Sequence, residues 1–590
     1  MTLTALAVGL TCVCGAQTVS GPSETARVEP PAAPDASRDS HASSAAPQPT
    51  VMQEIEALRS RIEQLENEVK AERARSLADS EDTAALKAAE KEVVGATANP
   101  APALHAAAQA ANPPSPAAPA TPPPPDIPAE ITTKSAPFAY ADWSWLNGNP
   151  RNEDEPLATK YFTPEFRADV NYTYDFNKPS DDSLGGSTET FRANEVQVEQ
   201  LSFGGDLRVH NVRGRFLTMY GMFATTTPRN DPSTARGQWD LANAYRYISE
   251  AWGGYHWNVA HGLNLDGGIF VSYIGLFSYY NFDNWAYQPS YVSSNTPWFF
   301  NGLRLQYFPS DKLKIEPWFI NGWQSYARSN SKPGLGGQIL YRPKPWLSMV
   351  FNNYGLGQDA PGTLSGGATA TRSRIHTDDS WQVKYYDKPS APLDKMAFSF
   401  TGDLGCEMGG GVRCTTGKPS SVAPKQAFLG WMAYNRIWFK KDLYAMTLGG
   451  GQMNNPGRYL TLLPPINGAT AITGTPYFTE NPGDKMHAYD GTATFDYMPK
   501  EFITFRWEWG YRHTDVSYWT GHGGITPPGG NNGSPAQYAC TVAGPGGNTA
   551  SGFTDLPDAQ SACAGFGGKV WFPDLRTQQI VSTVAIMVKF

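Results

Sequence analysis

Polar side chains, several of them charged, alternate with apolar and aromatic ones in two segments, 165–176 and 502–512. This spacing places the charged side chains on one face of a β-strand and the aromatic side chains on the other. A dry core penalises unpaired charges, whereas a water-filled lumen tolerates them, and rings of charge in a narrow lumen set an ion preference. The chemistry that they predict is electrostatic filtering of solutes. The charged residues are Arg167, Asp169, Arg506, Glu508 and Arg512.

Residues able to carry a reaction do not form a known catalytic pattern in this chain. None of the nine His residues lies in a His-Glu-x-x-His sequence, and Gly-x-Ser-x-Gly, P-loop and dinucleotide fingerprints are missing. A lipase-type pair at His256 or His261 is disfavoured because no Ser lies beside them. We therefore expect no enzyme activity, no cofactor and no metal.

Four cysteines lie outside the N-terminal leader: Cys406, Cys414, Cys540 and Cys563. An even number in an exported chain suggests disulfides, with each neighbouring pair inside one predicted loop. A zinc site is disfavoured because no Cys or His lies two or three residues from any of them.

The composition supports strands that cross a membrane. Aromatic residues make up 12 % of the 590 residues, and charged residues only 17 %, against about 25 % in typical soluble domains. The mean hydropathy is nevertheless −0.42, and no apolar run of roughly 18 residues predicts a transmembrane helix. Alternating strands resolve this conflict, because the hydropathy of each strand averages to an intermediate value while one of its faces stays apolar. The net charge of −8 predicts no nucleic-acid partner.

The last strand, 575–590, has one nearly all-apolar face and ends on the aromatic residue Phe590. A strand in lipid cannot keep an open edge, so it implies a closed barrel. We expect an all-β, transmembrane, antiparallel up-and-down barrel of sixteen strands, with 14–18 as the range, in which short turns alternate with long loops. The even count returns both ends to the periplasm. The long loops are expected near 177–193, 224–246, 277–297, 323–333, 355–377, 403–424, 452–485 and 514–574.

The region before the barrel divides by composition. Residues 1–16 are typical of a signal peptide, 17–50 of a disordered stretch, and 78–135 of an extended Ala/Pro-rich linker. Residues 51–77 carry apolar residues at heptad spacing, which predicts a coiled coil. Its seam residues favour a parallel dimer. Residues 61–66 follow an Arg-h-x-x-h-Glu pattern, in which h is an apolar residue, and this pattern favours a trimer. We expect the trimer because 16-stranded porins are usually trimers. A pre-barrel segment, 136–161, leads into the barrel at 162–590.

Several long motifs resemble those of the OmpL-like beta-barrel porin family of Gram-negative outer membranes. They are Asp142–Asn149, Lys160–Phe166, Ala244–Ala251, Asp283–Gly302, Lys314–Trp318 and Asn321–Trp323. The resemblance spans about 138–590 and implies an outer-membrane porin with passive permeation and no defined substrate. It also implies that Phe590 serves as a signal for barrel-insertion machinery.

The third long loop is expected to fold inward and narrow the pore, as in general porins, through Asp283, Asn284, Trp285 and Tyr287. Charged residues on inward faces would form the opposing wall. The alternative is that these charges pair across strands and hold the barrel's shape. The wall residues are Arg167, Asp169, Arg213, Arg215, Arg304, Lys314, Glu316, Arg506, Glu508 and Arg512. Trp346, Trp438, Tyr444 and Trp571 are interpreted as interfacial girdles.

The sequence therefore predicts an outer-membrane porin that lets small hydrophilic solutes diffuse through a water-filled barrel. Its expected partners are the lipid bilayer, small polar solutes and two further copies in a homotrimer, with peptidoglycan contact through the coiled coil. A carbohydrate-selective channel remains an alternative, because Tyr and Trp near 277–300 can stack on sugar rings. The other alternative is an outer-membrane anchor with a coiled coil that faces the cell wall.

Overall fold

The computed structural model of the chain describes residues 136–590 apart from several stretches within loops. The leader, the coiled coil and the Ala/Pro-rich linker expected before residue 136 lie outside the described residues and remain predictions. The excepted stretches are 186–188, 229–230, 232, 234–238, 329–331, 359–361, 364–368, 371–372, 410–412, 415–426, 456–485, 516–518, 523, 525–537, 542–548, 554–569 and 572–575.

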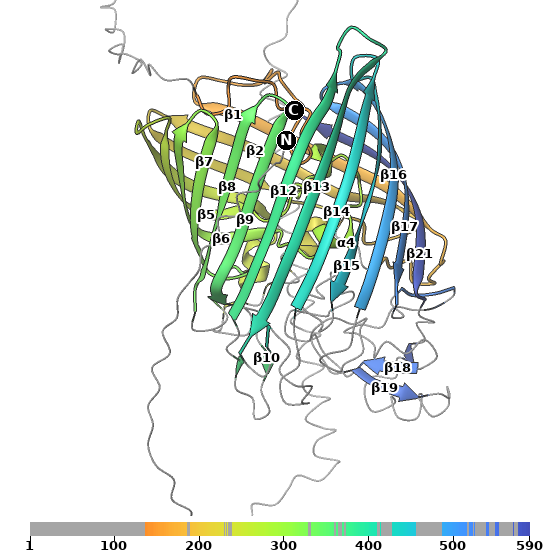
Figure 1. Ribbon diagram of the computed structural model, residues 1–590. Helices are drawn as coiled ribbons and strands as arrows, with labels where there is room; N and C mark the ends of the chain where they lie inside the picture. The colour runs from red at the N-terminus through yellow and green to blue at the C-terminus, as the bar shows by residue number, and fades with distance from the viewer. Residues whose placement is uncertain are drawn as a thin grey trace, which may run out of the picture. The chain divides into compact units, whose positions relative to one another are not determined.

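Sixteen of the described strands form one closed antiparallel barrel in which each strand pairs with its neighbours in chain order (Figure 1). The predicted fold class and strand number are confirmed. The barrel strands are β1 (Phe162–Asp175), β2 (Val196–Val209), β3 (Val212–Thr218), β4 (Ile248–Trp257), β5 (Leu263–Val271), β6 (Phe299–Ser310), β7 (Leu313–Ile320), β8 (Gly334–Lys344), β9 (Leu347–Gln358), β12 (Ser373–Asp387), β13 (Leu393–Met408), β14 (Ala427–Phe439), β15 (Tyr444–Asn455), β16 (Met486–Lys500), β17 (Ile503–Thr514) and β21 (Gln578–Lys589).

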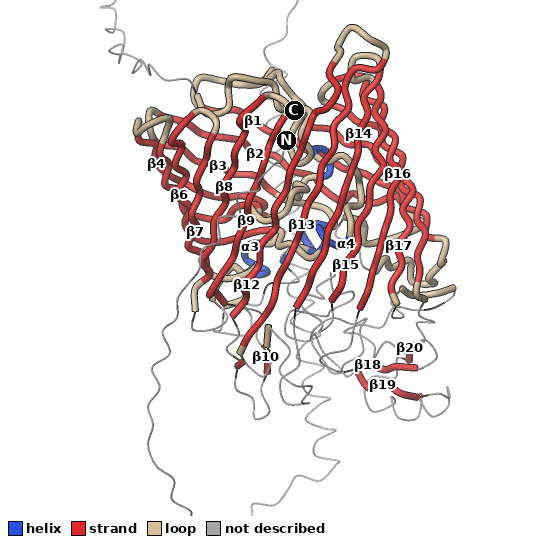
Figure 2. The backbone as a smooth tube through the Cα atoms, in the orientation of Figure 1, coloured by secondary structure: helices blue, strands red, loops and turns tan. Residues whose placement is uncertain are grey.

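Connections of two very different lengths alternate around the barrel. Seven are short, the longest of them five residues, and lie at the end where the C-terminus lies, here called the short-turn end (Figures 1 and 2). Eight long connections lie at the other end, the long-loop end. They carry the remaining elements: α2 (Phe223–Thr226), α3 (Leu241–Tyr245), η3 (Asn281–Asp283), α4 (Tyr291–Ser294), β10 (Gly362–Thr363), β11 (Thr369–Ala370), β18 (Tyr538–Thr541), β19 (Thr549–Phe553) and β20 (Val570–Trp571).

The barrel strands carry apolar side chains outward and charged side chains inward. In β17, Trp507 and Trp509 are 49 % and 43 % exposed, whereas Arg506 and Glu508 are 3 % and 2 % exposed. A soluble barrel would show the reverse, because water favours charged groups outside. This inverted pattern is stable where lipid surrounds the barrel. None of the described helices is long and apolar enough to cross a membrane.

One residue of the predicted aromatic girdles faces inward. Trp438 is buried, 5 % exposed, and its ring packs against Trp285 with 5.7 Å between centroids. It shares the inward register of β14 with Tyr434 and Arg436, so its interpretation as a girdle residue is wrong. Trp346 is exposed at the β8–β9 turn, as a girdle residue should be.

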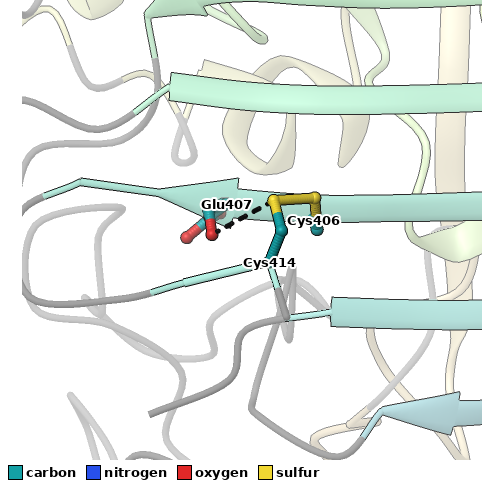
Figure 3. The surroundings of a disulfide bond; sticks show 3 residues. All are labelled: Cys406, Glu407 and Cys414. Atoms are coloured by element: carbon teal, nitrogen blue, oxygen red, sulfur yellow. Dashed lines mark hydrogen bonds between the residues drawn. A yellow bond between two sulfur atoms is a disulfide. The ribbon is translucent and has the colours of Figure 1, made fainter. Parts of the chain in front are cut away.

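Cys406 and Cys414 form a disulfide at the long-loop end (Figure 3). Cys406 lies within β13, because this strand continues to Met408 and passes the start expected for the loop. The bridge therefore links the end of a strand to the following loop, and the expectation that both residues lie in one loop is wrong. Cys563 lies outside the described residues, so the pairing of Cys540 with Cys563 remains a prediction.

The barrel closes where β21 pairs with β17 on one side and β1 on the other. Phe590 extends this closure by one residue: its amide donates to the Phe166 carbonyl at 3.0 Å, and its carbonyl accepts from the Phe166 amide at 3.3 Å. Its ring stacks on Phe502 with 5.5 Å between centroids. The terminal residue therefore joins both neighbouring strands at the seam.

Deleting Phe590 should lower the fraction of chains that reach the folded, heat-modifiable barrel more than it lowers total exported protein. The deletion removes two backbone hydrogen bonds and two aromatic contacts at the seam, those with Phe166 and Phe502. Gel mobility before and after heating measures the folded fraction. Phe590→Leu keeps the backbone pairing and serves as control. Equal folded fractions in wild type and deletion would contradict the prediction.

Candidate functional site

The third long connection, residues 272–298 between β5 and β6, folds into the barrel. It is here called the pore loop. Its short helix α4 contacts β14, β15 and β16, and η3 contacts β21. The loop therefore leaves the barrel wall at β5 and crosses the lumen to strands on the other side. Asp283, Asn284, Trp285 and Tyr287 lie on this loop and are all buried.

Strand β1 holds the first half of the pore loop through polar side chains. The Asp169 carboxylate accepts hydrogen bonds from the Asn281 amide and the Tyr287 hydroxyl, each at 2.9 Å. One guanidinium nitrogen of Arg167 lies 3.1 Å from an Asp283 carboxylate oxygen. Burial raises the pKa of the Asp283 carboxyl above its ordinary value, and the positive charge of Arg167 opposes this rise.

Strand β17 binds the backbone of the same loop. The Arg506 guanidinium donates to the Asn284 carbonyl at 2.7 Å and also pairs with Asp496 at 2.7 Å. The Glu508 carboxylate accepts the amides of Tyr287 and Gln288 at 2.6 and 2.8 Å. Arg512 donates to the Pro289 carbonyl at 2.8 Å. The loop has no regular ladder of its own, so these side chains satisfy the backbone groups that it buries.

Strands β14 to β16 hold the second half of the loop at the start of α4. The Tyr434 hydroxyl accepts the Ser290 amide at 2.8 Å, and Asp490 accepts the Ser290 hydroxyl at 2.7 Å and the Tyr291 amide at 3.0 Å. A glycine makes this approach possible: a Cβ on Gly451 would lie 2.4 Å from the Ser290 hydroxyl oxygen.

The pre-barrel segment also enters the barrel, from the short-turn end. Trp143, Trp145 and Leu146 are buried in one cluster with Trp285 of the pore loop. The Asn147 side chain accepts the Trp285 amide at 2.7 Å, and the Asn147 amide donates to Gln382 of β12 at 2.8 Å. The sequence predicted only a lead-in to the barrel at 136–161. Its closely spaced tryptophans, Trp143 and Trp145, are the signal that could have revealed a buried element.

The predicted wall residues on β3, β6 and β7 form ion pairs with carboxylates of the barrel wall. Arg213 and Arg304 share Asp266, at 3.3 and 2.9 Å. Lys314 pairs with Glu316 at 2.8 Å. Arg215 pairs with Glu165, Asp206 and Glu250 at 2.8, 2.7 and 2.8 Å. The pairs of Arg213, Arg215 and Arg304 link different strands and agree with the alternative that the charges brace the barrel, whereas Lys314 and Glu316 both lie in β7.

Cavities remain on both sides of the pore loop. One of about 1020 Å³ at the short-turn end is lined by Arg213 and Lys314, among others. A second of about 280 Å³ is lined by Arg304, Lys314 and Glu316. A third of about 360 Å³, on the opposite side, is lined by Asp283, Asn284, Trp285 and Arg506.

The predicted site residues therefore divide into two groups. Arg167, Asp169, Arg506, Glu508 and Arg512 touch the pore loop directly instead of facing it across an opening. Arg213, Arg304, Lys314 and Glu316 line other cavities, whereas Arg215 pairs with carboxylates of the neighbouring strands. The structure does not gather all of them around one passage, and their role as a constriction remains a prediction.

Glu508→Gln should loosen the pore loop, because a neutral glutamine side chain accepts hydrogen bonds from the backbone N–H groups of Tyr287 and Gln288 more weakly than a carboxylate does. A buried charge-assisted hydrogen bond contributes about 1.5–3 kcal/mol. We expect faster proteolysis within 272–298 and larger fluctuations of single-channel current. Glu501 also accepts two backbone amides, from Glu153 and Asp154, but on the exposed rim, so Glu501→Gln is the control. Unchanged proteolysis and current in Glu508→Gln would contradict this account.

Trp145→Ala should destabilise the barrel by about 3–5 kcal/mol, as measured by urea unfolding, because it empties the space of a fully buried indole. Single-channel conductance should rise at the same time, since the segment would fill less of the lumen. Leu157→Ala, at a residue of the same segment that is 57 % exposed, should change neither quantity. A stable variant with wild-type conductance would refute the role given to this segment.

Comparisons with known proteins found similar solved structures and one matching family. Outer-membrane OmpT of Vibrio cholerae is similar at 8 % identity and a TM-score of 0.39, covering 74 % of this chain and 99 % of its own. Pseudomonas putida OprB has 9 % identity and a TM-score of 0.37, covering 73 % and 94 %. The outer-membrane channel DcaP of Acinetobacter baumannii has 12 % identity and a TM-score of 0.36, covering 73 % and 96 %.

No curated protein matches the chain in sequence. The model of one family, described as "Putative beta-barrel porin-2, OmpL-like", matches residues 167–544, which is well over half of the chain. This match includes the pore loop and most of the strands that bind it. The chain therefore belongs to the OmpL-like beta-barrel porin-2 family.

Proposed function

We propose that this protein is an outer-membrane porin through which small hydrophilic solutes diffuse without a reaction. The observation that carries the proposal is the inverted barrel, with charged side chains facing a lumen that keeps cavities of about 1020 and 280 Å³ beside its inward-folded loop. A lumen lined with charge lowers the cost of moving polar solutes through the bilayer. Family membership supports the same function.

The short-turn end faces the periplasm in this proposal, because outer-membrane barrels place short turns there and long loops outside. Strand β1 begins at that end, so the N-terminal region is periplasmic. The predicted coiled coil would then join copies into a trimer and contact peptidoglycan. The pore loop would narrow the passage, with Asp283, Asn284, Trp285 and Tyr287 positioned by the strands that they touch.

A structural anchor is the second candidate, and one observation favours it. The pore loop and the pre-barrel segment fill much of the lumen with buried aromatic side chains. Beyond the cavity of about 280 Å³, a cavity of about 20 Å³ adjoins the pore loop. A barrel filled in this way would attach the chain to the membrane without passing solutes.

Swelling of proteoliposomes distinguishes the two candidates. A porin should admit glycine and glucose from iso-osmotic solution, with rates that fall as solute size rises, because the narrow part of the lumen filters by size. Liposomes with heat-denatured protein provide the control. Absence of swelling with every solute, from liposomes that contain folded barrel, would refute the porin and favour the anchor.

A further inference from the structure

The cavities on the β2–β9 side of the lumen adjoin one another. The cavity of about 1020 Å³ and that of about 280 Å³ share Gln306, Lys314 and Leu340 in their walls. The smaller of the two shares Ser278 and Tyr279 of the pore loop with the narrow space of about 20 Å³ beyond it. The three spaces outline one path along this wall, from the short-turn end past the pore loop.

Cations outnumber carboxylates along the two larger cavities of this path. Low-dielectric walls focus the field of such charges into the space between them, so an excess of one sign raises the local concentration of the opposite ion. The lining groups are the cations Arg208, Arg213, Arg304, Lys314 and Arg342 and the carboxylates Asp206 and Glu316.

Two of these cations have no carboxylate partner within 4.0 Å among the described residues: Arg208 and Arg342. The strand register places Arg208 directly opposite Arg213, although like charges in this position repel each other. Arg213 already has Asp266 as its partner, at 3.3 Å. The repulsion persists beside a cavity where a mobile anion can offset it.

Arg342 lies at the junction of the path and the pre-barrel segment. Its guanidinium carbon lies 5.0 Å from the Phe138 ring centroid and 4.8 Å from that of Trp143. Its buried Nε has no hydrogen-bond partner in the described part of the chain. Aromatic faces position the guanidinium but do not neutralise it, so its charge stays available to a passing anion.

We infer that solutes cross along the β2–β9 wall and that this route prefers small anions, including carboxylates, through Arg208 and Arg342. The inference rests on the proposed porin function and adds a substrate class to it. Guanidinium groups suit this class because they bind carboxylates through two parallel hydrogen bonds. Rings of Arg and Lys side chains select anions in other pores by the same physics.

The reversal potential of the full-length protein in planar bilayers tests the inference, with a potassium chloride gradient followed by a potassium acetate gradient. We expect a permeability ratio of anion to potassium above one in both salts. Arg208→Gln with Arg342→Gln should bring the ratio towards one. Lys500→Gln removes one positive charge beside the cavity of about 360 Å³ on the other side of the loop, and should leave the ratio unchanged.

A conducting wild type that prefers potassium would overturn the inference while leaving the porin function intact. An unchanged anion-to-potassium permeability ratio in the double variant would also overturn the inference. The same holds if this ratio falls in Lys500→Gln instead. A folded protein without conductance would contradict the porin function itself and the inference with it. The wild-type ratio needs no variant, so a double variant that fails to insert does not remove the test.

Discussion

The bilayer provides no hydrogen-bonding groups, so every backbone amide and carbonyl of a spanning strand must pair with another strand. In this chain the requirement is met by closing the sheet, and β21 is the strand that completes it between β17 and β1. The outer faces can then be fully apolar, as at Trp507 and Trp509. Charged side chains such as Arg506 and Glu508 are consequently directed into the lumen.

The inward direction of polar side chains explains why an irregular loop can lie inside the barrel. The pore loop buries backbone groups that have no regular partners, and inward side chains of β14, β16 and β17 provide hydrogen-bond partners for them, while side chains of β1 bind side chains of the loop. Glu508, Asp490 and Tyr434 accept its amides, while Arg506 and Arg512 donate to its carbonyls. Glu508, Arg506 and Arg512 are therefore used to hold the loop, and Arg506 also lines the cavity of about 360 Å³. The cations along the β2–β9 wall line the cavities of about 1020 and 280 Å³.

Period-two alternation was enough to predict the barrel, because it depends on each strand alone. The pattern at Arg167 and Asp169 identified the inward face, and the alternation of turns and loops gave sixteen strands. Contacts between distant segments could not be predicted in this way. Asp283 meets Arg167 only after the barrel closes, and Trp438 was misassigned because its partner Trp285 comes from the pore loop. Gly451, in the glycine run 449–451 of β15, is a signal that could have shown where the loop approaches.

Thiol labelling during current recording tests most directly which side of the loop stays open. Gln306 lines both cavities of the β2–β9 wall, whereas Thr494 is 2 % exposed and its hydroxyl donates to Glu508 beneath the loop. Gln306→Cys should react with a charged methanethiosulfonate reagent and lose current, relative to wild type under the same treatment. Thr494→Cys should stay unmodified. Modification of Thr494→Cys with block, and none in Gln306→Cys, would contradict the account.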